Sequence, residues 1–77
     1  MIQFYFHCSN AEQILVDRYG AAVRDLAEAR DHAALVMRTL IMAPGDEDWR
    51  PWVLHISDDS GEEIFDVPFA SLLGKPH

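Results

Sequence analysis

One cysteine and one lysine occur among the 77 residues, and each scarcity excludes a class of function. Cys8 has no second cysteine, so the chain forms no internal disulfide and offers no cysteine cluster for a structural zinc ion. Only 6 basic residues stand against 13 acidic ones, which gives a formal net charge of −7. Such a field repels nucleic-acid phosphates and anionic membrane surfaces, so we expect neither nucleic acid nor a membrane as a partner.

Long apolar segments are also missing. No stretch approaches the roughly 20 apolar residues that a membrane-spanning helix requires. The first residues, MIQFYFHC, lack the basic start and the apolar length of a signal peptide, so we expect a cytoplasmic protein. Hydrophobic residues make up 49% of the chain, which suits a folded domain. We expect a single domain, residues 1–77, whose small core leaves little room for a deep cleft.

Three segments alternate between apolar and polar side chains, the period of a strand with one buried face. Residues 2–8 are the first, and there the alternation predicts a core-facing set of Ile2, Phe4, Phe6 and Cys8. Residues 14–16 follow a Ser-Asn turn signal and predict a shorter partner strand. Residues 52–57 and 64–69 are the other two alternating segments, and the DDSG sequence between them predicts a turn.

A single helix is predicted between these pairs of strands. Asp25 is a favourable N-cap, and Glu28 follows at the capping-box spacing. Pro44-Gly45 ends the helix, and Gly20 supplies a bend before it. Apolar residues gather on one side of this helix at 100° per residue: Leu26, Ala29, Ala33, Val36, Met37, Leu40 and Ile41. The order ββαββ predicts an α+β domain of two layers, a four-stranded, mainly antiparallel sheet with one helix on one face.

The sequence Trp-Arg-Pro-Trp, residues 49–52, follows an acidic run at residues 46–48. At a C-terminus this tetrapeptide resembles the corepressor-docking peptide of some eukaryotic transcriptional repressors, but here residues 53–77 follow it. We interpret it as the start of a strand, with Pro51 at the first position, where a missing N–H costs least. Trp52 then begins the inward alternation, and Trp49 covers the edge of the sheet.

The candidates for chemistry are few. His7 adjoins Cys8, but neighbouring side chains of a strand point to opposite faces, so the histidine cannot activate the thiol. We predict that Cys8 is a small core residue. The acidic runs at residues 46–48 and 58–63 lack the spacing of a calcium-binding loop and are interpreted as solvated loops. We therefore expect no enzyme, no cofactor and no bound metal.

The face of the sheet that turns away from the helix is the strongest functional candidate. Alternation places on it Gln3, Tyr5, His7, Val53, His55 and, in the last strand, Ile64. This face is half apolar, and small sheets often cover such a face by pairing with a second copy. Leu35, on the helix side opposite the core, is a second exposed apolar position. We predict a non-enzymatic protein-interaction module that forms a homodimer or binds another protein.

Two other functions remain open from the sequence. One is a small-ligand or metal-binding protein that uses Tyr5, His7 and His55, provided that the strands carrying the two histidines are neighbours. The other is an antitoxin-like regulator, whose short hairpin-helix-strand domains look broadly similar. Antitoxins usually carry a basic DNA-binding segment, and the scattered arginines of this chain do not form one.

Several short motifs together resemble a known family. An aromatic strand ends in histidine at residues 4–7, and an acid and a glycine (Asp17, Gly20) precede the helix. The helix contains Leu26 and the pair Ala29-Arg30. The second half has Trp52, the Asp-x-x-Gly turn of residues 58–61 and the Val-Pro-Phe of residues 67–69. This set resembles a family of short alphaproteobacterial proteins of unknown function over nearly the whole chain, with an insertion at residues 44–48. The resemblance implies a fold and a bacterial cytoplasmic setting, and no site residues.

Overall fold

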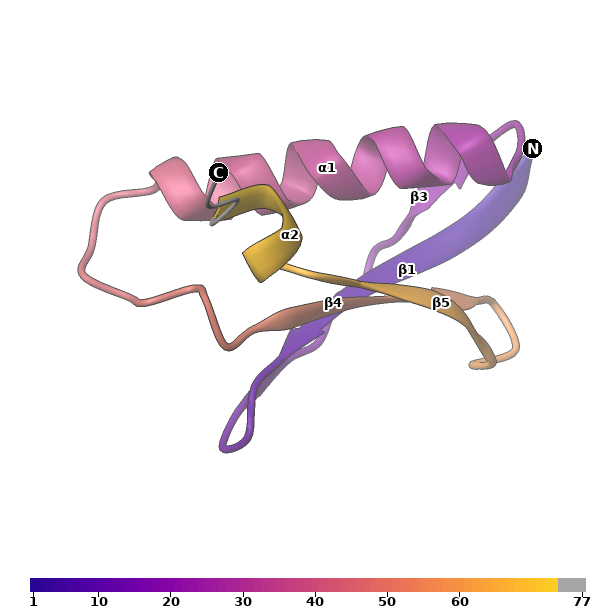
Figure 1. Cartoon of the computed structure of the whole chain (residues 1–77). Helices are drawn as coiled ribbons and strands as arrows, with labels where there is room; N and C mark the ends of the chain where they lie inside the picture. Colours follow the sequence, from indigo (N-terminus) through magenta and orange to yellow (C-terminus); the bar gives the residue numbers. More distant parts are fainter. Residues whose placement is uncertain (74–77) are drawn as a thin grey trace.

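An antiparallel sheet carries one long helix across one of its faces (Figure 1). The structure is a computed structural model, and it describes residues 1–73. The elements in chain order are β1 (Ile2–Ser9), β2 (Ile14–Leu15), β3 (Ala21–Val23), α1 (Leu26–Met42), β4 (Val53–Asp58), β5 (Glu63–Pro68) and α2 (Ala70–Leu73). The strand order is β2-β1-β4-β5, with β3 also paired to β1. The predicted α+β class with a helix on one face is confirmed.

The strand β3 was not predicted from the sequence, which indicated only a bend at Gly20. β3 pairs with residues 2–4 of β1, whereas β2 pairs with residues 8–9 of the same strand. Because β4 occupies the other side of β1, β2 and β3 share one edge of the sheet and follow each other along it. The sheet therefore has five strands instead of four, and the edge next to β1 is interrupted at its middle.

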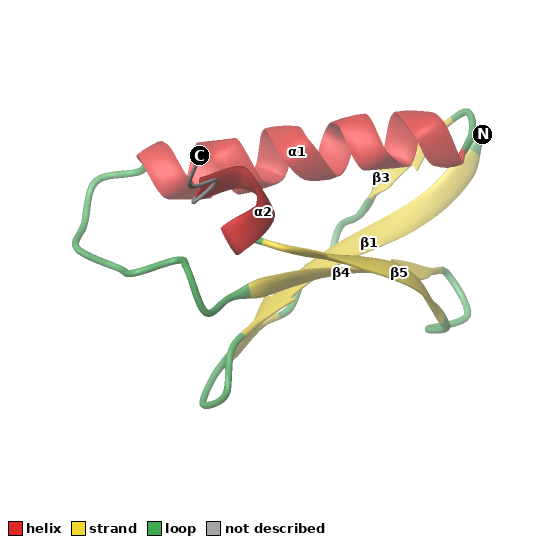
Figure 2. Ribbon diagram, viewed as in Figure 1, coloured by secondary structure: helices red, strands yellow, loops and turns green. Residues whose placement is uncertain are grey.

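The core lies between this sheet and α1, as the alternation predicted (Figure 2). Its buried side chains are Phe4, Phe6, Cys8, Val23, Ala29, Ala33, Met37, Trp52, Leu54, Ile56 and Phe69, with Val36, Leu40, Ile41, Phe65 and Val67 packed partly buried around them. Two predictions were wrong, because Ile2 and Leu26 are 45% and 44% exposed. Each is the first residue of its element, and only β3 pairs with β1 at Ile2, so little structure is available there to cover either side chain.

Capping explains where α1 begins. The side chain of Asp25 accepts a hydrogen bond from the backbone N–H of Glu28 at 2.9 Å, as the predicted N-cap requires. The Glu28 carboxylate reaches one residue beyond the cap and accepts from the backbone N–H of Arg24 at 2.7 Å. The helix ends at Met42, just before Pro44-Gly45. Within residues 1–73, none of the helices has both the length and the apolar character that crossing a membrane would need.

The Trp-Arg-Pro-Trp segment closes the long loop between α1 and β4 (Figure 2). The Trp52 side chain is 1% exposed, and its indole N–H donates to Glu47 Oε2 at 3.1 Å. The ring of Trp49 packs against Trp52 and against Phe69, with centroids 4.9 and 5.2 Å apart. Pro51 lies in the turn before β4 and not at its first residue, because the N–H of Trp52 bonds back to the carbonyl of Trp49. These contacts of Trp49 and Trp52 hold the end of the loop against the core.

Candidate functional site: the open face of the sheet

We use the term open face for the side of the sheet that turns away from α1. Of the residues predicted there, β1 supplies Gln3, Tyr5 and His7, and β4 supplies Val53 and His55. All of them are half-buried, although none of the elements described in residues 1–73 covers this face as a second layer. β1 and β4 are neighbours, and His7 lies directly opposite His55 in their register. The sequence could not decide whether the strands that carry the two histidines are neighbours, and the structure shows that they are.

Asp17 ties the interrupted edge of the sheet to β1. Its carboxylate Oδ2 accepts a hydrogen bond from the backbone N–H of Phe6 at 3.1 Å, at the point of β1 that lies between the residues paired with β3 and those paired with β2. The backbone N–H of Asp17 in turn donates to Nδ1 of His7 at 3.0 Å. A side-chain carboxylate takes the place of the missing strand pairing.

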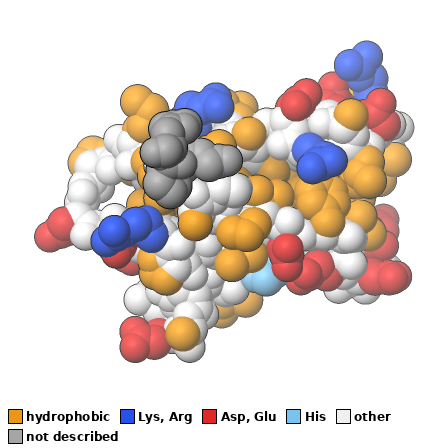
Figure 3. Space-filling view, viewed as in Figure 1, with side chains coloured by type: hydrophobic (Ala, Val, Ile, Leu, Met, Phe, Trp, Pro, Cys, Tyr) orange, Lys and Arg blue, Asp and Glu red, His pale blue; other side chains and the backbone are white. Residues whose placement is uncertain are grey.

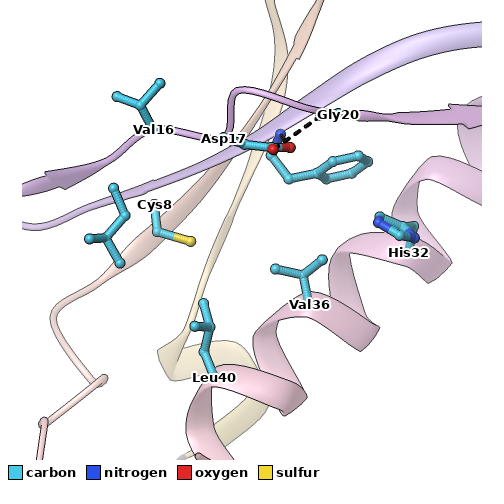
Figure 4. Close-up of a pocket in the computed structure, with 9 residues that line it drawn as sticks. Cys8, Val16, Asp17, Gly20, His32, Val36 and Leu40 are labelled. Carbon is cyan, nitrogen blue, oxygen red and sulfur yellow. Dashed lines mark hydrogen bonds between the residues drawn. The ribbon is translucent and has the colours of Figure 1, made fainter.

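The other carboxylate oxygen of Asp17 closes the turn that leads to β3. Oδ1 accepts from the N–H of Tyr19 at 3.0 Å. It also accepts from the N–H of Gly20 at 3.1 Å (Figure 4). Burial alone would raise the pKa of this carboxyl, but the three donated N–H bonds and the nearby imidazole of His7 outweigh it and lower the pKa below its ordinary value of 3.8. Asp17 is therefore held as a carboxylate at neutral pH.

Gly20 is required by this turn for two reasons. Its φ of +70° is a conformation that side chains with a Cβ rarely adopt, and an added Cβ would lie 2.6 Å from the carbonyl oxygen of Phe4. The spacing of Asp17 and Gly20, with the aspartate three residues before the glycine, is typical of an Asx-type turn. That spacing was the signal in the sequence for the role of Asp17, a residue that entered our predictions only through the family resemblance.

Side chains from β1 extend this hydrogen-bonded strip. The amide Nε2 of Gln3 donates to the carbonyl oxygen of Tyr19 at 2.8 Å. The ring of Tyr5 stands parallel to that of His7, with an interplanar angle of 5° and centroids 6.3 Å apart. The open face is therefore ordered by directional contacts along β1.

On β4, His55 has a partner on each ring nitrogen. Nε2 lies 2.8 Å from the hydroxyl of Ser9, and Nδ1 lies 2.9 Å from Oε1 of Glu63. Asp66 is the direct cross-strand partner of His55 on β5. One ligand atom from each of His55, Glu63 and Asp66 lies within 4.8 Å of the other two. Sequence reasoning found His55 and missed the rest, because these neighbours depend on strand register.

A β-bulge decides which side chain of β5 stands beside His55. Ile56 pairs with Phe65, but the next residue, Ser57, pairs with Glu63, so Ile64 is passed over in the register. Ile64 lines a shallow groove with Leu26 and Arg30 of α1 and with Phe65 and Asp66 of β5. The alternation that placed Ile64 on the open face fails at this bulge, and Glu63 takes that position.

Comparison with protein-family models matches residues 3–70 to a family described as a domain of unknown function, DUF6894. The chain belongs to the DUF6894 family. Comparisons with curated proteins and with solved structures found no match. The matched range runs from β1 to the first residue of α2 and therefore contains the whole open face. The resemblance to a family of unknown function is thus confirmed, and its bacterial cytoplasmic setting stays a prediction.

The helix side of this DUF6894 domain offers a different kind of surface. An open groove of about 320 Å³ lies between β2 and α1, lined mainly by apolar side chains and reached by Asp17 and His32 (Figure 4). Cys8 lies in its wall and is 2% exposed, and its predicted place in the core is confirmed. Burial, and to a smaller extent the charge of Asp17, raises the pKa of the Cys8 thiol to about 11. The thiol is therefore protonated at neutral pH and is a poor nucleophile.

Proposed function

We propose that this protein is a non-enzymatic interaction module that pairs with a second copy of itself through the open face. The proposal is supported by one observation above others. The central strip of this face, Tyr5, His7, Val53 and His55, is half-buried, and Nδ1 of His7 and both ring nitrogens of His55 have partners within the chain. It combines the low polarity and the order that a contact surface needs.

The energetic argument concerns desolvation. A polar group that loses water without a hydrogen-bond partner costs free energy, and one that already has a partner costs much less. Nδ1 of His7 and both ring nitrogens of His55 have partners inside the chain, so a second copy that covers these three atoms leaves none of them without a hydrogen bond. The ring of Tyr5 and the side chain of Val53 add apolar surface. A two-fold axis would bury this strip from both copies at once.

Charge opposes the pairing and sets its salt dependence. Each copy carries a formal net charge of −7, and Glu63 and Asp66 stand exposed beside the strip. Salt at 0.1 M screens exposed charges beyond about 10 Å, so added salt should tighten the pairing. Association driven by opposite charges would weaken in salt instead, and the sign of the salt effect separates the two cases.

Sedimentation of the protein at tens of micromolar, in low and in high salt, tests the proposal. The wild type should form a dimer, more completely in high salt, and the double variant Tyr5→Glu, Val53→Glu should be a monomer. The matched control Leu35→Glu, Met42→Glu adds the same two charges to exposed positions of α1 and should still form the dimer. A wild type that stays monomeric in both salts contradicts the proposal. Loss of the dimer in the control instead would move the contact to the helix.

A further inference from the structure

We infer that His55, Glu63 and Asp66 form a binding site for one divalent transition-metal ion of the Zn²⁺ type. These residues come from β4 and β5, at the side of the open face away from Asp17. The inference goes beyond the proposed self-association and does not depend on it. From the sequence we expected no bound metal, and the alternative of a metal site used Tyr5, His7 and His55; Glu63 and Asp66 could not be added to it, because this set assembles across two strands.

The distances among the three candidate ligands suit a single ion. Their ligand atoms all lie within 4.8 Å of one another, and Nδ1 of His55 is already 2.9 Å from Glu63 Oε1. With metal–ligand bonds of about 2.0–2.2 Å, ligand atoms of a tetrahedral site stand roughly 3.3–3.6 Å apart. Glu63 and Asp66 are exposed, so a small side-chain movement can close the remaining gap. The strand backbones need not move.

The pairing of β4 with β5 brings His55, Glu63 and Asp66 together. The register places Asp66 directly opposite His55. In an unbroken ladder, Ile64 would come next on the open face, but the bulge replaces it by Glu63. Bulges commonly redirect a side chain in this way next to functional sites. In the space-filling view, a histidine side chain lies beside acidic side chains on the lower part of the molecule, below the helix (Figure 3).

Ser9 supplies the support that a metal-binding histidine needs. Histidines that bind metal through one ring nitrogen usually donate the N–H of the other to an oxygen, which fixes the tautomer. The hydroxyl of Ser9 lies 2.8 Å from Nε2 of His55 and can accept that hydrogen. In the tautomer with its hydrogen on Nδ1, His55 donates to Glu63 and accepts a hydrogen bond from the Ser9 hydroxyl. On metal binding, the hydrogen moves to Nε2, the hydroxyl turns to accept it, and Nδ1 binds the ion.

The donor set indicates the class of ion. One imidazole nitrogen and two carboxylates suit Zn²⁺ and similar transition-metal ions, whereas Ca²⁺ and Mg²⁺ prefer oxygen ligands throughout. The two carboxylates neutralise the charge of the ion, and the net charge of −7 raises the local concentration of cations. Three protein ligands leave a coordination position for water or a small ligand.

Calorimetric titration of the metal-stripped protein with Zn²⁺ at neutral pH tests the site. The wild type should bind one equivalent, and Glu63→Gln and Asp66→Asn should each weaken binding tenfold or more, by analogy with losses of metal-site residues. Glu62→Gln and Asp59→Asn remove the same charge from neighbouring exposed positions and should leave the affinity unchanged. Mg²⁺ should not compete at similar concentrations.

Two further measurements make the result decisive. Zn²⁺ should shift the NMR signals of the His55 ring and leave those of His32 unchanged, and it should raise the melting temperature of the wild type but not of Asp66→Asn. The monomeric variant Tyr5→Glu, Val53→Glu keeps all three ligands and should still bind the ion, which separates this site from the self-association. No saturable binding of one equivalent, or equal weakening in the control variants, would overturn the inference.

Discussion

The two faces of the sheet are built from alternate residues of the same strands, yet they are held in different ways. On the helix side, Phe4, Phe6, Leu54 and Ile56 are at most 6% exposed and are fixed by apolar packing. On the open face, the imidazole of His55 is fixed by hydrogen bonds to named partners. Apolar packing depends on volume and tolerates no charge, whereas a hydrogen-bonded surface can exchange a partner for a ligand. The imidazoles of His7 and His55, with their hydrogen-bond partners, lie on the open face.

The two edges of the sheet show how the open face acquires its polar groups. At the β2–β3 edge, the interruption brings Asp17 to His7. At the β5 edge, the bulge brings Glu63 to His55. Each departure from a regular ladder gives one histidine a hydrogen-bond partner, the backbone N–H of Asp17 for His7 and the carboxylate of Glu63 for His55. Regular pairing alone would have left both histidines without these neighbours.

Breaking the helix-side face should have the largest effect. Phe6→Ala removes a ring that is 5% exposed and packs against His32 at 4.7 Å, and it should lower the free energy of unfolding by about 3–5 kcal/mol. A chain of 77 residues has a total stability of only about 4–11 kcal/mol, so the variant is close to unfolded. Urea denaturation followed by circular dichroism measures the loss. A loss below about 1 kcal/mol would show that Phe6 does not face the core.

Breaking the interrupted edge should have an intermediate effect. Asp17→Ala leaves the N–H of Phe6 and two N–H groups of the turn without their charged acceptor, at a cost of about 2–3 kcal/mol. The Asp17 carboxyl has a lowered pKa in the folded protein, so its contribution is present above its ordinary pKa and is lost as the pH falls through the folded value. From about pH 4 downward, the stability of the wild type should therefore approach that of Asp17→Asn.

Urea denaturation of the wild type and of Asp17→Asn between pH 7 and pH 2 provides the test. The carboxyls of Asp48 and Asp58 also have lowered pKa values, the first chiefly through Arg50 and the second chiefly through the Ser60 hydroxyl. Both carboxyls are present in the wild type and in Asp17→Asn, so the difference between the two curves isolates Asp17. A difference that stays constant over this range would mean that the carboxylate form is not favoured by folding.

Altering the open face should have the smallest effect on the stability of a single chain. The double variant Tyr5→Glu, Val53→Glu changes half-buried side chains outside the core and should cost about 1 kcal/mol or less at micromolar concentration. Its helix-side packing is untouched. A cost as large as that of Phe6→Ala would mean that the two faces do not differ as described.

The alternation of side chains was enough to predict the central strands, because burial of one face imposes a period of two on any strand. It identified the buried face of β1 from Phe4 to Cys8 and the inward residues of β4 and β5, and the capping pattern located Asp25 correctly. It failed for β3, since Ala21–Val23 is a short segment whose extended form depends on pairing with β1. Three residues are too few for an alternating pattern to be recognised in the sequence.

The neighbourhood of each histidine on the open face was decided by tertiary structure alone. Residues 7 and 55 are far apart in sequence, and only the pairing of β1 with β4 sets them opposite each other. Glu63 reaches His55 because β5 has one extra residue at the bulge. The alternation of side chains in the sequence gives no sign of this extra residue. Apolar periodicity is a local property of the chain, whereas register is set by the balance of pairing and packing across the whole sheet.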